Sequence, residues 1–450
     1  MKTVLRDLVL AIVAFVCANV SVADTTAFVN VNVVPMSAEG VIAAQTVIVK
    51  NGVIGAVGAV DETRIPEDAR AVDGTDRFLM PGLGEMHAHV PDAASPNLER
   101  DFDLFVANGV TTIRGMLGKP SHLGLRRQLM DGEVFGPRLV TSGPSLNGRS
   151  VDGAADARRQ VREQEALGYD FIKVHPGLSA EEFVAIAETA NELGIPHAGH
   201  VPVAAGIDTV LRLGMASIDH LDGYLVAMLP PDSYRSGGYG GFFDVMLASE
   251  ADAAKIDELA AATAAAGTWN VPTQVLIEQR VNAVSVETLQ SRTEMKYVTA
   301  ATADKWIARK QEQITERGFD PEVAALAIEL RRRLILALHE SGAPLLLGSD
   351  APQVFNVPGF SVHRELGVLV AAGLTPFEAL QTGTTAVAEF LGLNTGSVEV
   401  GKDADLVLLD ANPLDDIRNS RRIHGVMLRG AWLPAITLEK RLDKHRQDAR

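Results

Sequence analysis

Two histidines stand two positions apart in PGLGEMHAHV (residues 81–90), and their spacing is the first feature that suggests chemistry. In a β-strand, alternate side chains leave the same face, so His87 and His89 would stand side by side. Neutral imidazole is a common metal ligand, and two that converge are a natural start for a metal site. The chain has only 11 histidines in 450 residues. Such a short pair also occurs by chance on surfaces, so the rest of the chain must decide.

Short apolar runs alternate with helix-like stretches from about residue 78 onward, and this alternation predicts the scaffold that holds the pair. Eight runs read as strands: residues 77–89, 111–117, 137–143, 170–176, 195–201, 216–221, 269–276 and 343–350. Several of the helical stretches between them end in glycine, as a helix C-terminus often does. Eight strand–helix units predict an α/β protein with a (β/α)8 TIM barrel. A doubly wound open sheet shows the same alternation and stays open as the alternative.

Both ends of the chain carry short β-type runs outside this alternation. Asn51-Gly52 between two alternating apolar runs is a strong signal for a type I′ hairpin. We therefore expect residues 24–77 and 391–436 to pair as one small β-sandwich domain, with the barrel at 78–390. Residues 437–450 form a charge-rich tail, interpreted as a solvated helix or a frayed end.

Six residues that could bind metal or carry protons fall at or near the ends of the predicted strands. They are His87, His89, Lys173, His200, His220 and Asp350. In a barrel the C-terminal strand ends carry the catalytic groups. Each residue alone has an ordinary explanation, since a lysine can reach solvent, an aspartate can cap a helix and a histidine can pack in a core. Together, in this order, they predict one functional rim.

The motifs that contain these residues resemble the amidohydrolase superfamily of metal-dependent hydrolases. The resemblance lies in PGLGEMHAH, GVTTIRG, FIKV, AGHVP, SIDHL, GSDAP and the segment GLTPFEALQTGTTAVAEFLGLNTGSVEVGKDADLVLLD, and it extends to about residue 430. Within the superfamily the chain is similar to imidazolonepropionase-like proteins and to Xaa-Pro and Xaa-Arg/Lys dipeptidases. One departure is Gly84-Glu85, where the family commonly has Ile-Asp before the first ligand histidine. Neither position is expected to bind metal.

The resemblance implies two divalent metal ions, most simply Zn²⁺, because imidazole and carboxylate ligands suit zinc. His87, His89 and Asp350 match the ligands of one ion. His200 and His220 match the ligands of the second.

Lys173, carboxylated by carbon dioxide, matches the family's bridge between the two ions. The implied mechanism is attack by a metal-bridging hydroxide on an amide carbonyl, with Asp350 as general base and then general acid. His175 and Tyr224 are candidates for substrate contact, and packing is an equally good explanation for Tyr224. Arg114 in TTIRG is interpreted as a buried structural arginine.

Composition bounds the partners. Hydrophobic residues make up 47% and charged residues 22% of the chain, as in soluble globular proteins. The net charge of −16 argues against nucleic acid or an anionic membrane as partner. A homo-oligomer is compatible with this composition.

The N-terminus, MKTVLRDLVLAIVAFVCANVSVAD, is typical of a signal peptide. Lys2 and Arg6 precede an apolar stretch of about ten residues, too short to span a membrane. Cleavage near Ala23 would remove Cys17, the only cysteine. A large exported chain without disulfides predicts a periplasmic protein without stable membrane insertion.

Three functions follow from these observations. The leading one is a binuclear hydrolase of an amide bond in a small peptide or N-acyl amino acid. A mononuclear cyclic amide hydrolase of the imidazolonepropionase or deaminase type is the second, and a non-catalytic periplasmic binding protein is the third. The glycine-rich RSGGYGGFF (residues 235–243) is expected to form a mobile loop at the barrel mouth.

The signal peptide yields a direct prediction. Expression of the full chain in a bacterium with a periplasm should place a shortened protein there, beginning at Asp24, as read by N-terminal sequencing. The intact N-terminus recovered with the membrane fraction would show instead that the segment is a retained anchor.

Overall fold

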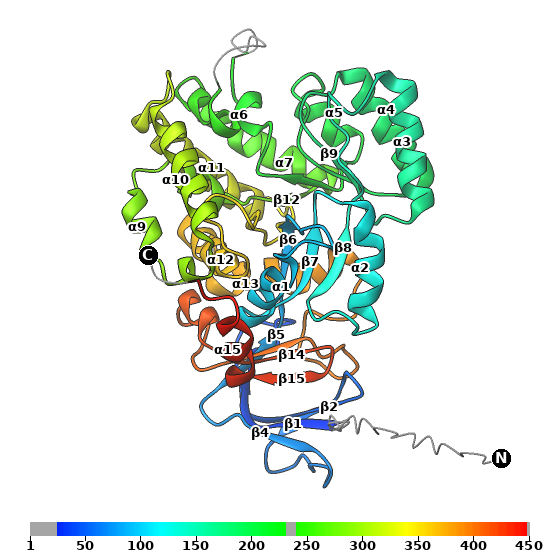
Figure 1. Cartoon of the computed structure of the whole chain (residues 1–450), viewed down its shortest axis with the longest axis vertical. Helices are drawn as coiled ribbons and strands as arrows, with labels where there is room; N and C mark the ends of the chain where they lie inside the picture. Colours follow the sequence, from blue (N-terminus) through cyan, green and yellow to red (C-terminus); the bar gives the residue numbers. More distant parts are fainter. Residues whose placement is uncertain (1–24, 231–239, 448–450) are drawn as a thin grey trace, which may run out of the picture.

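The computed structural model of the chain describes residues 25–230 and 240–447. The predicted signal peptide lies outside these residues, and so does most of the predicted loop 235–243. The described part contains parallel strands surrounded by helices, and a separate sheet at one end of the molecule (Figure 1). Within those residues no helix is long and apolar enough to cross a membrane.

The end sheet has eight strands that come from both ends of the chain. They are β1 (Thr25–Val33), β2 (Ile42–Lys50), β3 (Val53–Ala59), β4 (Arg70–Asp73), β5 (Phe78–Pro81), β13 (Leu406–Leu409), β14 (Ile423–Leu428) and β15 (Ala431–Pro434). The order is β15-β14-β13-β5-β1-β2-β3, with β4 paired to β1. The N-terminal and C-terminal strands therefore join in one sheet, as expected, through the antiparallel pair β5–β13. The two packed layers of a sandwich stay a prediction.

The β2–β3 turn confirms the hairpin signal. Asn51 and Gly52 both have positive φ, at 51° and 78°, as a type I′ turn requires. Phe28 of β1 and Trp432 of β15 pack edge to face with ring centroids 5.0 Å apart, so the apolar core of this sheet also links the two ends of the chain.

The parallel strands follow the predicted positions. They are β6 (Leu83–Ala88), β7 (Val110–Gly115), β8 (Arg138–Thr141), β9 (Ile172–Val174), β10 (His197–Gly199), β11 (Ser217–Asp219) and β12 (Trp269–Val271). They form two sheets, β6-β7-β8 and β12-β11-β10-β9, and the bridge Ser142–Phe171 lies between the sheets. The eighth predicted strand, residues 343–350, is a bridged segment instead of a regular strand. It still bonds on both sides, since Leu346 N donates to Asn270 O and Met86 N donates to Leu347 O.

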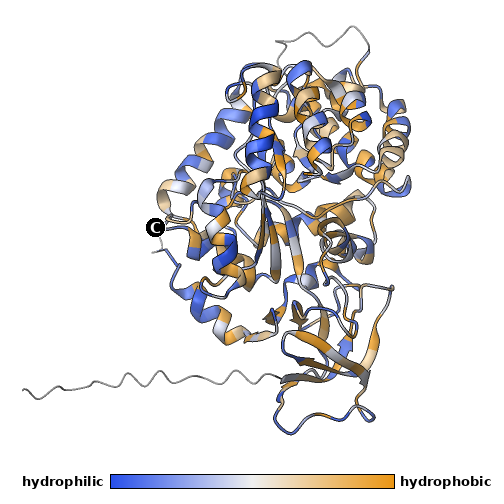
Figure 2. Ribbon diagram, turned by 90° about the vertical axis from the view of Figure 1, so that its right-hand side faces the viewer, coloured by the Kyte–Doolittle hydropathy of each residue, from blue (hydrophilic) through white to orange (hydrophobic). Residues whose placement is uncertain are grey.

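Helices follow the strands and cover them from outside. Those up to β12 are α1 (Leu98–Ala107), α2 (Pro120–Met130), α3 (Gly153–Leu167), α4 (Ala180–Leu193), α5 (Gly206–Arg212), α6 (Tyr224–Ala227) and α7 (Ile256–Ala266). Those after it are α8 (Gln274–Val281), α9 (Val286–Gln290), α10 (Ala300–Thr315), α11 (Pro321–Glu340), α12 (Phe360–Ala372), α13 (Pro376–Gly383), α14 (Thr385–Leu391) and α15 (Ala435–Asp443). Many helices alternate between hydrophilic and hydrophobic residues, as amphipathic surface helices do (Figure 2). Gly168, Gly194 and Gly267 end α3, α4 and α7 in the left-handed conformation.

The charged tail, interpreted as a solvated helix or a frayed end, is helical as far as Asp443, and most of its described charged residues are exposed. It forms α15 and packs on α1, where Arg441 and His445 both contact the buried carboxylate of Asp103 at 2.6 and 2.8 Å. A buried carboxylate needs such partners, and the pattern of the tail alone does not show that Asp103 is buried.

Removing the ring of Phe28 tests the joint between the two chain ends. Phe28→Ala should lower the free energy of unfolding by about 3 to 5 kcal/mol, because it leaves a cavity in a closed apolar core. Urea unfolding followed by circular dichroism measures the change. Val400→Ala, at a residue 63% exposed, is the control and should change little. Equal stability of both variants would contradict this assignment of the core.

Candidate metal centre and active site

The six predicted rim residues all line one cavity of about 150 Å³. Its walls are His87, His89, Leu117, Lys173, His175, His200, His220, Phe242, Phe243, Leu276, Asp350 and Gln353. The histidines and the aspartate come from the C-terminal ends of β6, β10, β11 and the 343–350 segment. The tertiary structure thus brings together residues that span 264 positions of sequence.

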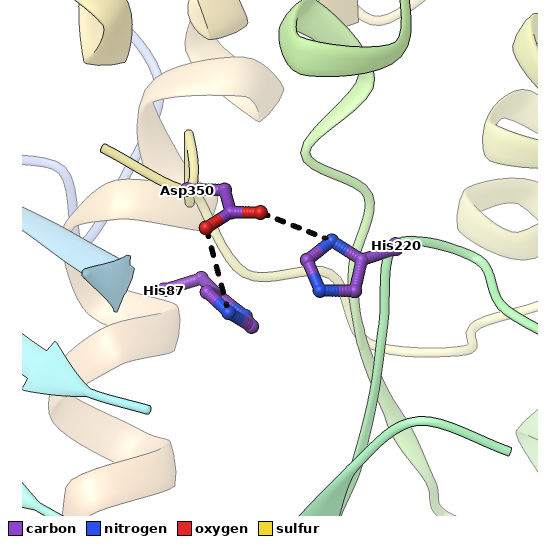
Figure 3. Close-up of side chains that lie close together, drawn as sticks. All are labelled: His87, His220 and Asp350. Carbon is purple, nitrogen blue, oxygen red and sulfur yellow. Dashed lines mark ion pairs between the residues drawn. The ribbon is translucent and has the colours of Figure 1, made fainter. Parts of the chain in front are cut away.

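Three of these residues present metal-ligating atoms within 4.8 Å of one another: His87, His220 and Asp350 (Figure 3). Asp350 Oδ1 lies 3.8 Å from His87 Nε2, and Asp350 Oδ2 lies 3.8 Å from His220 Nδ1. His89 Nε2 is 2.9 Å from Asp350 Oδ1. Ligands of a tetrahedral zinc ion lie about 3.3 Å apart, so these residues lie close enough together to be candidate metal ligands.

Backbone conformation aims two of these side chains. His220 and Asp350 have positive φ, at 64° and 63°, directly after their strand or bridged segment. Positive φ is uncommon for residues other than glycine and concentrates at functional sites. At His220 the turn has a clear effect: Asp219 and His220 are adjacent in sequence, yet both contact residues of the cavity.

The protonation states suit a cation. Burial lowers the pKa of His87 to about 4 and holds the pKa of His220 well below its ordinary value, so both imidazoles are neutral at physiological pH. Burial alone would raise the pKa of Asp350, but His89 and His87 outweigh it and lower that pKa. Asp350 Oδ1 is buried without a well-formed hydrogen bond. Neutral imidazoles and an ionised carboxylate with spare lone pairs fit a divalent metal ion.

Asp219 is the central residue that the motif SIDH does not reveal, because the motif draws attention to His220. Asp219 Oδ2 lies 3.0 Å from His87 Nδ1 and 3.3 Å from Lys173 Nζ, and Oδ1 lies 3.0 Å from Arg114. Burial alone would raise the pKa of Asp219, but Arg114 and Lys173 hold it well below its usual range. Arg114 is fully buried, as its interpretation as a structural arginine predicted. On β11, Asp219 stands two positions after Ser217 and so shares its face of the strand. This alternation is the one sequence signal that could have placed the Asp219 side chain inward.

Two other histidines have partners that hold the ring. His200 Nδ1 contacts Asp222 Oδ2 at 3.1 Å, and His220 Nδ1 contacts Thr273 Oγ1 at 2.8 Å. A hydrogen bond at one ring nitrogen sets the tautomer and orientation of a ligating histidine. Neither Asp222 nor Thr273 stands in a sequence motif that predicts a hydrogen bond to a histidine of the cavity.

Lys173 lies on β9 and is 1% exposed. Burial lowers the pKa of its amine, and Asp219 is the partner of its Nζ. Gly199 on β10 leaves room for its stem, since a Cβ there would lie 2.9 Å from Lys173 Cδ and 2.3 Å from Val174 O. Gly199 also has φ of 128°, so two constraints require glycine beside the lysine.

The Gly84-Glu85 departure has a structural explanation. Glu85 is fully buried, and its Oε1 accepts hydrogen bonds from His87 N at 3.0 Å and Ser349 N at 2.8 Å. Burial raises the pKa of Glu85 to about 8. Glu85 therefore ties the strand that carries His87 to the segment that ends in Asp350.

Of the two residues predicted to contact substrate, one lines the cavity and the other does not. His175 lines the cavity, with its ring centroid 4.8 Å from that of His200. Tyr224 does not reach the cavity: it is fully buried, and its hydroxyl bonds Thr263 at 2.9 Å and Asn270 at 3.1 Å. It is the first residue of α6. These contacts agree with the other explanation given for Tyr224, which was packing.

Comparisons with known proteins agree with this architecture. The Aspergillus niger ochratoxinase is 22% identical over 443 residues, covering 82% of this chain and 78% of that protein. Bottromycin amidohydrolase superposes with a TM-score of 0.74 at 24% identity, covering 94% of this chain and 91% of that one. A Xaa-Pro dipeptidase with bound methionine gives a TM-score of 0.66 at 18% identity, covering 91% and 100%.

The fold is therefore an α/β fold of the TIM-barrel type. Residues 78–433 match the sequence model of the Amidohydrolase family, and the chain belongs to that family. Membership makes it a hydrolase that acts on carbon–nitrogen bonds.

Neutralising Asp219 tests its contact with His87. Asp219→Asn should weaken metal retention by about 10- to 100-fold, because carboxylates behind ligating histidines contribute that much. Competition with a chelator, followed by metal analysis, measures it. Asp131→Asn, at an exposed position, is the matched control. Unchanged retention in a variant with normal circular dichroism would contradict the role of Asp219.

Proposed function

We propose that this protein is a binuclear metal-dependent hydrolase that cleaves an amide bond in a small peptide or N-acyl amino acid. The observation that carries the proposal is the place of Lys173, a buried lysine in the same cavity as five histidines and an aspartate. A lone ammonium group there would repel cations, whereas a carboxylated lysine is an anion that two cations can share.

The ligands would divide between two ions, most simply zinc. His87, His89 and Asp350 would hold one, and His200 and His220 the other. When bound, such ions polarise a carbonyl and lower the pKa of water.

Asp350 is the residue placed to move a proton. Its Oδ2 faces His220, and its Oδ1 faces His87 and His89. As an ionised carboxylate it can accept a proton from the attacking water and return it to the leaving nitrogen. Phe242 and Phe243 make part of the cavity wall apolar.

Carboxylation of Lys173 requires its neutral amine, since the nitrogen lone pair must attack carbon dioxide. Burial favours that form by lowering the pKa of the amine. Asp219 contacts the Lys173 amine, and Arg114 contacts Asp219, so both would orient the carboxylated lysine. The positive charge of Arg114 would help to balance the negative charge of the carboxylated lysine.

The alternatives predict different chemistry at Lys173. A mononuclear cyclic amide hydrolase or deaminase needs no carboxylated lysine and leaves the buried amine without a function. A binding protein needs neither the neutral imidazoles nor Asp350. The complete ligand set in one cavity favours the binuclear hydrolase over both.

Further proposals concern organisation and location. We propose that the seven parallel strands and the bridged segment 343–350 close into a (β/α)8 barrel over residues 78–390. Residues 24–77 and 391–436 would form the β-sandwich. We also propose export to the periplasm, a small-molecule amide or dipeptide as substrate, and no nucleic-acid partner.

Metal content tests the two-ion proposal. Purified protein reconstituted with zinc and bicarbonate should hold about two zinc ions per chain by plasma mass spectrometry, and Lys173→Ala should hold about one or fewer. Omitting bicarbonate should lower the content of the wild type only. Lys310→Ala is the matched control, since Lys310 is equally buried and bonds carbonyl groups outside the cavity. One zinc ion in both proteins would contradict the bridge.

Replacing Asp350 tests the proton transfer. Asp350→Asn should lower kcat for an N-acyl amino acid by about 100- to 10,000-fold, because a general acid–base group contributes that much. Metal content measured on the same sample separates lost ligation from lost proton transfer. Full activity in the variant would contradict the assigned role.

A further inference from the structure

A second pocket, of about 360 Å³, adjoins the metal cavity. The two share His89 and Leu117 as walls, so a molecule held at the cavity can extend directly into this pocket. Much of its lining is apolar: Leu104, Tyr297, Val298, Trp306 and Val357. A 3₁₀ helix (Thr293–Tyr297) supplies Tyr297, α10 supplies Trp306, and Val298 lies between these two elements. Both elements lie between β12 and α11, in a region where the sequence shows no motif.

One cation in this pocket, Lys119, has no ion-pair partner among the described residues. The charge of Asp92 acts on it only from beyond ion-pair distance, where it opposes the lowering of the Lys119 pKa by burial. Lys119 Nζ donates to Val90 O at 2.8 Å, and among the described residues no carboxylate lies within ion-pair distance of it. An ammonium group has three donors, so two remain for a ligand. Arg100 in the same pocket is used differently, because its Nε and Nη2 both contact Asp101 Oδ1, at 2.9 and 2.8 Å. The pocket therefore has one cation in excess.

A different hollow that adjoins the metal cavity carries acidic side chains. A hollow of about 610 Å³ shares His200, Phe242 and Phe243 with the cavity and carries Asp222 and Asp244. No lysine or arginine is among the described residues that line it. A negatively charged end of a substrate is therefore favoured beside Lys119 over a place beside Asp222 and Asp244.

We propose that Lys119 binds the α-carboxylate of the substrate's last amino acid, the one that hydrolysis releases. The adjoining pocket holds the large apolar side chain of that amino acid. The proposal rests on the proposed function and narrows it. The substrate class becomes an N-acyl amino acid or dipeptide whose last residue is aromatic or a large aliphatic. An apolar cavity of about 150 Å³ holds a benzene molecule, so this pocket has room for a ring.

The charge contact is tested with N-acetyl-L-phenylalanine and its carboxamide. Lys119→Met should raise KM for the acid about tenfold or more, because a charge-assisted hydrogen bond is lost, and leave kcat within about twofold. KM for the carboxamide should not change. Lys119→Arg should recover part of the difference, and Lys50→Met, at an exposed lysine of β2, should behave as wild type. Equal loss for both compounds, or no loss, would overturn the role of Lys119.

A binding measurement separates this proposal from the hydrolase itself. Trp306 lies in the pocket wall, so N-acetyl-L-phenylalanine should change its fluorescence. The change should be absent in Trp306→Phe and need at least about tenfold more ligand in Lys119→Met. Binding of this kind without hydrolysis of any amide would refute the hydrolase and leave the pocket standing. Hydrolysis without this fluorescence change, together with equal rates for the N-acetyl derivatives of glutamate and phenylalanine, would refute the role of the pocket and leave the hydrolase proposal standing.

Discussion

The site depends on the contacts that the carboxylate of Asp219 makes with residues on three other strands. It is fully buried, and it holds Arg114 on β7, His87 on β6 and Lys173 on β9 from its own place on β11. Removing ions from water is costly, and a buried ion pair repays that cost only when its remaining hydrogen bonds are made. Here each carboxylate oxygen has a partner, and Ser217 also donates to Oδ1 at 3.0 Å. Four strands are thus held at one point by charge and hydrogen bonding.

The same network explains why the cavity can tolerate so many titratable groups. Burial keeps His87 and His220 neutral, so the histidines do not add positive charge beside Arg114 and Lys173. Asp219 supplies the compensating negative charge. A metal site needs this combination, because ligands must be deprotonated and yet be held in place before the ion arrives.

Specificity and chemistry come from different parts of the chain. The ligands stand on strand ends, which the surrounding helices make rigid. The two flanking hollows are built largely from helices and loops inserted after the strands, such as α10 and the segment around Phe243. This division is typical of barrel enzymes, in which the scaffold stays and the loops select the substrate.

The sequence alone predicted the parallel strands and the six residues that line one cavity. Alternation of short apolar runs with helical stretches predicted the strand positions to within a few residues, because that periodicity is local. The HxH spacing and the order of the strand-end residues predicted which side chains would meet. The Asn51-Gly52 turn was also readable, since its two positive φ angles depend on adjacent residues.

Only the tertiary structure decided which groups support those ligands. Asp219 meets Arg114 across 105 positions, and Thr273 meets His220 across 53. No local pattern encodes such contacts, because they depend on how strands pack side by side. Tyr224 lies outside the cavity wall for the same reason, since its hydroxyl bonds Thr263 and Asn270, which are 39 and 46 positions away in sequence. The pocket beside Lys119 likewise exists only because α10 folds over the strand ends, where side chains far apart in sequence enclose one space.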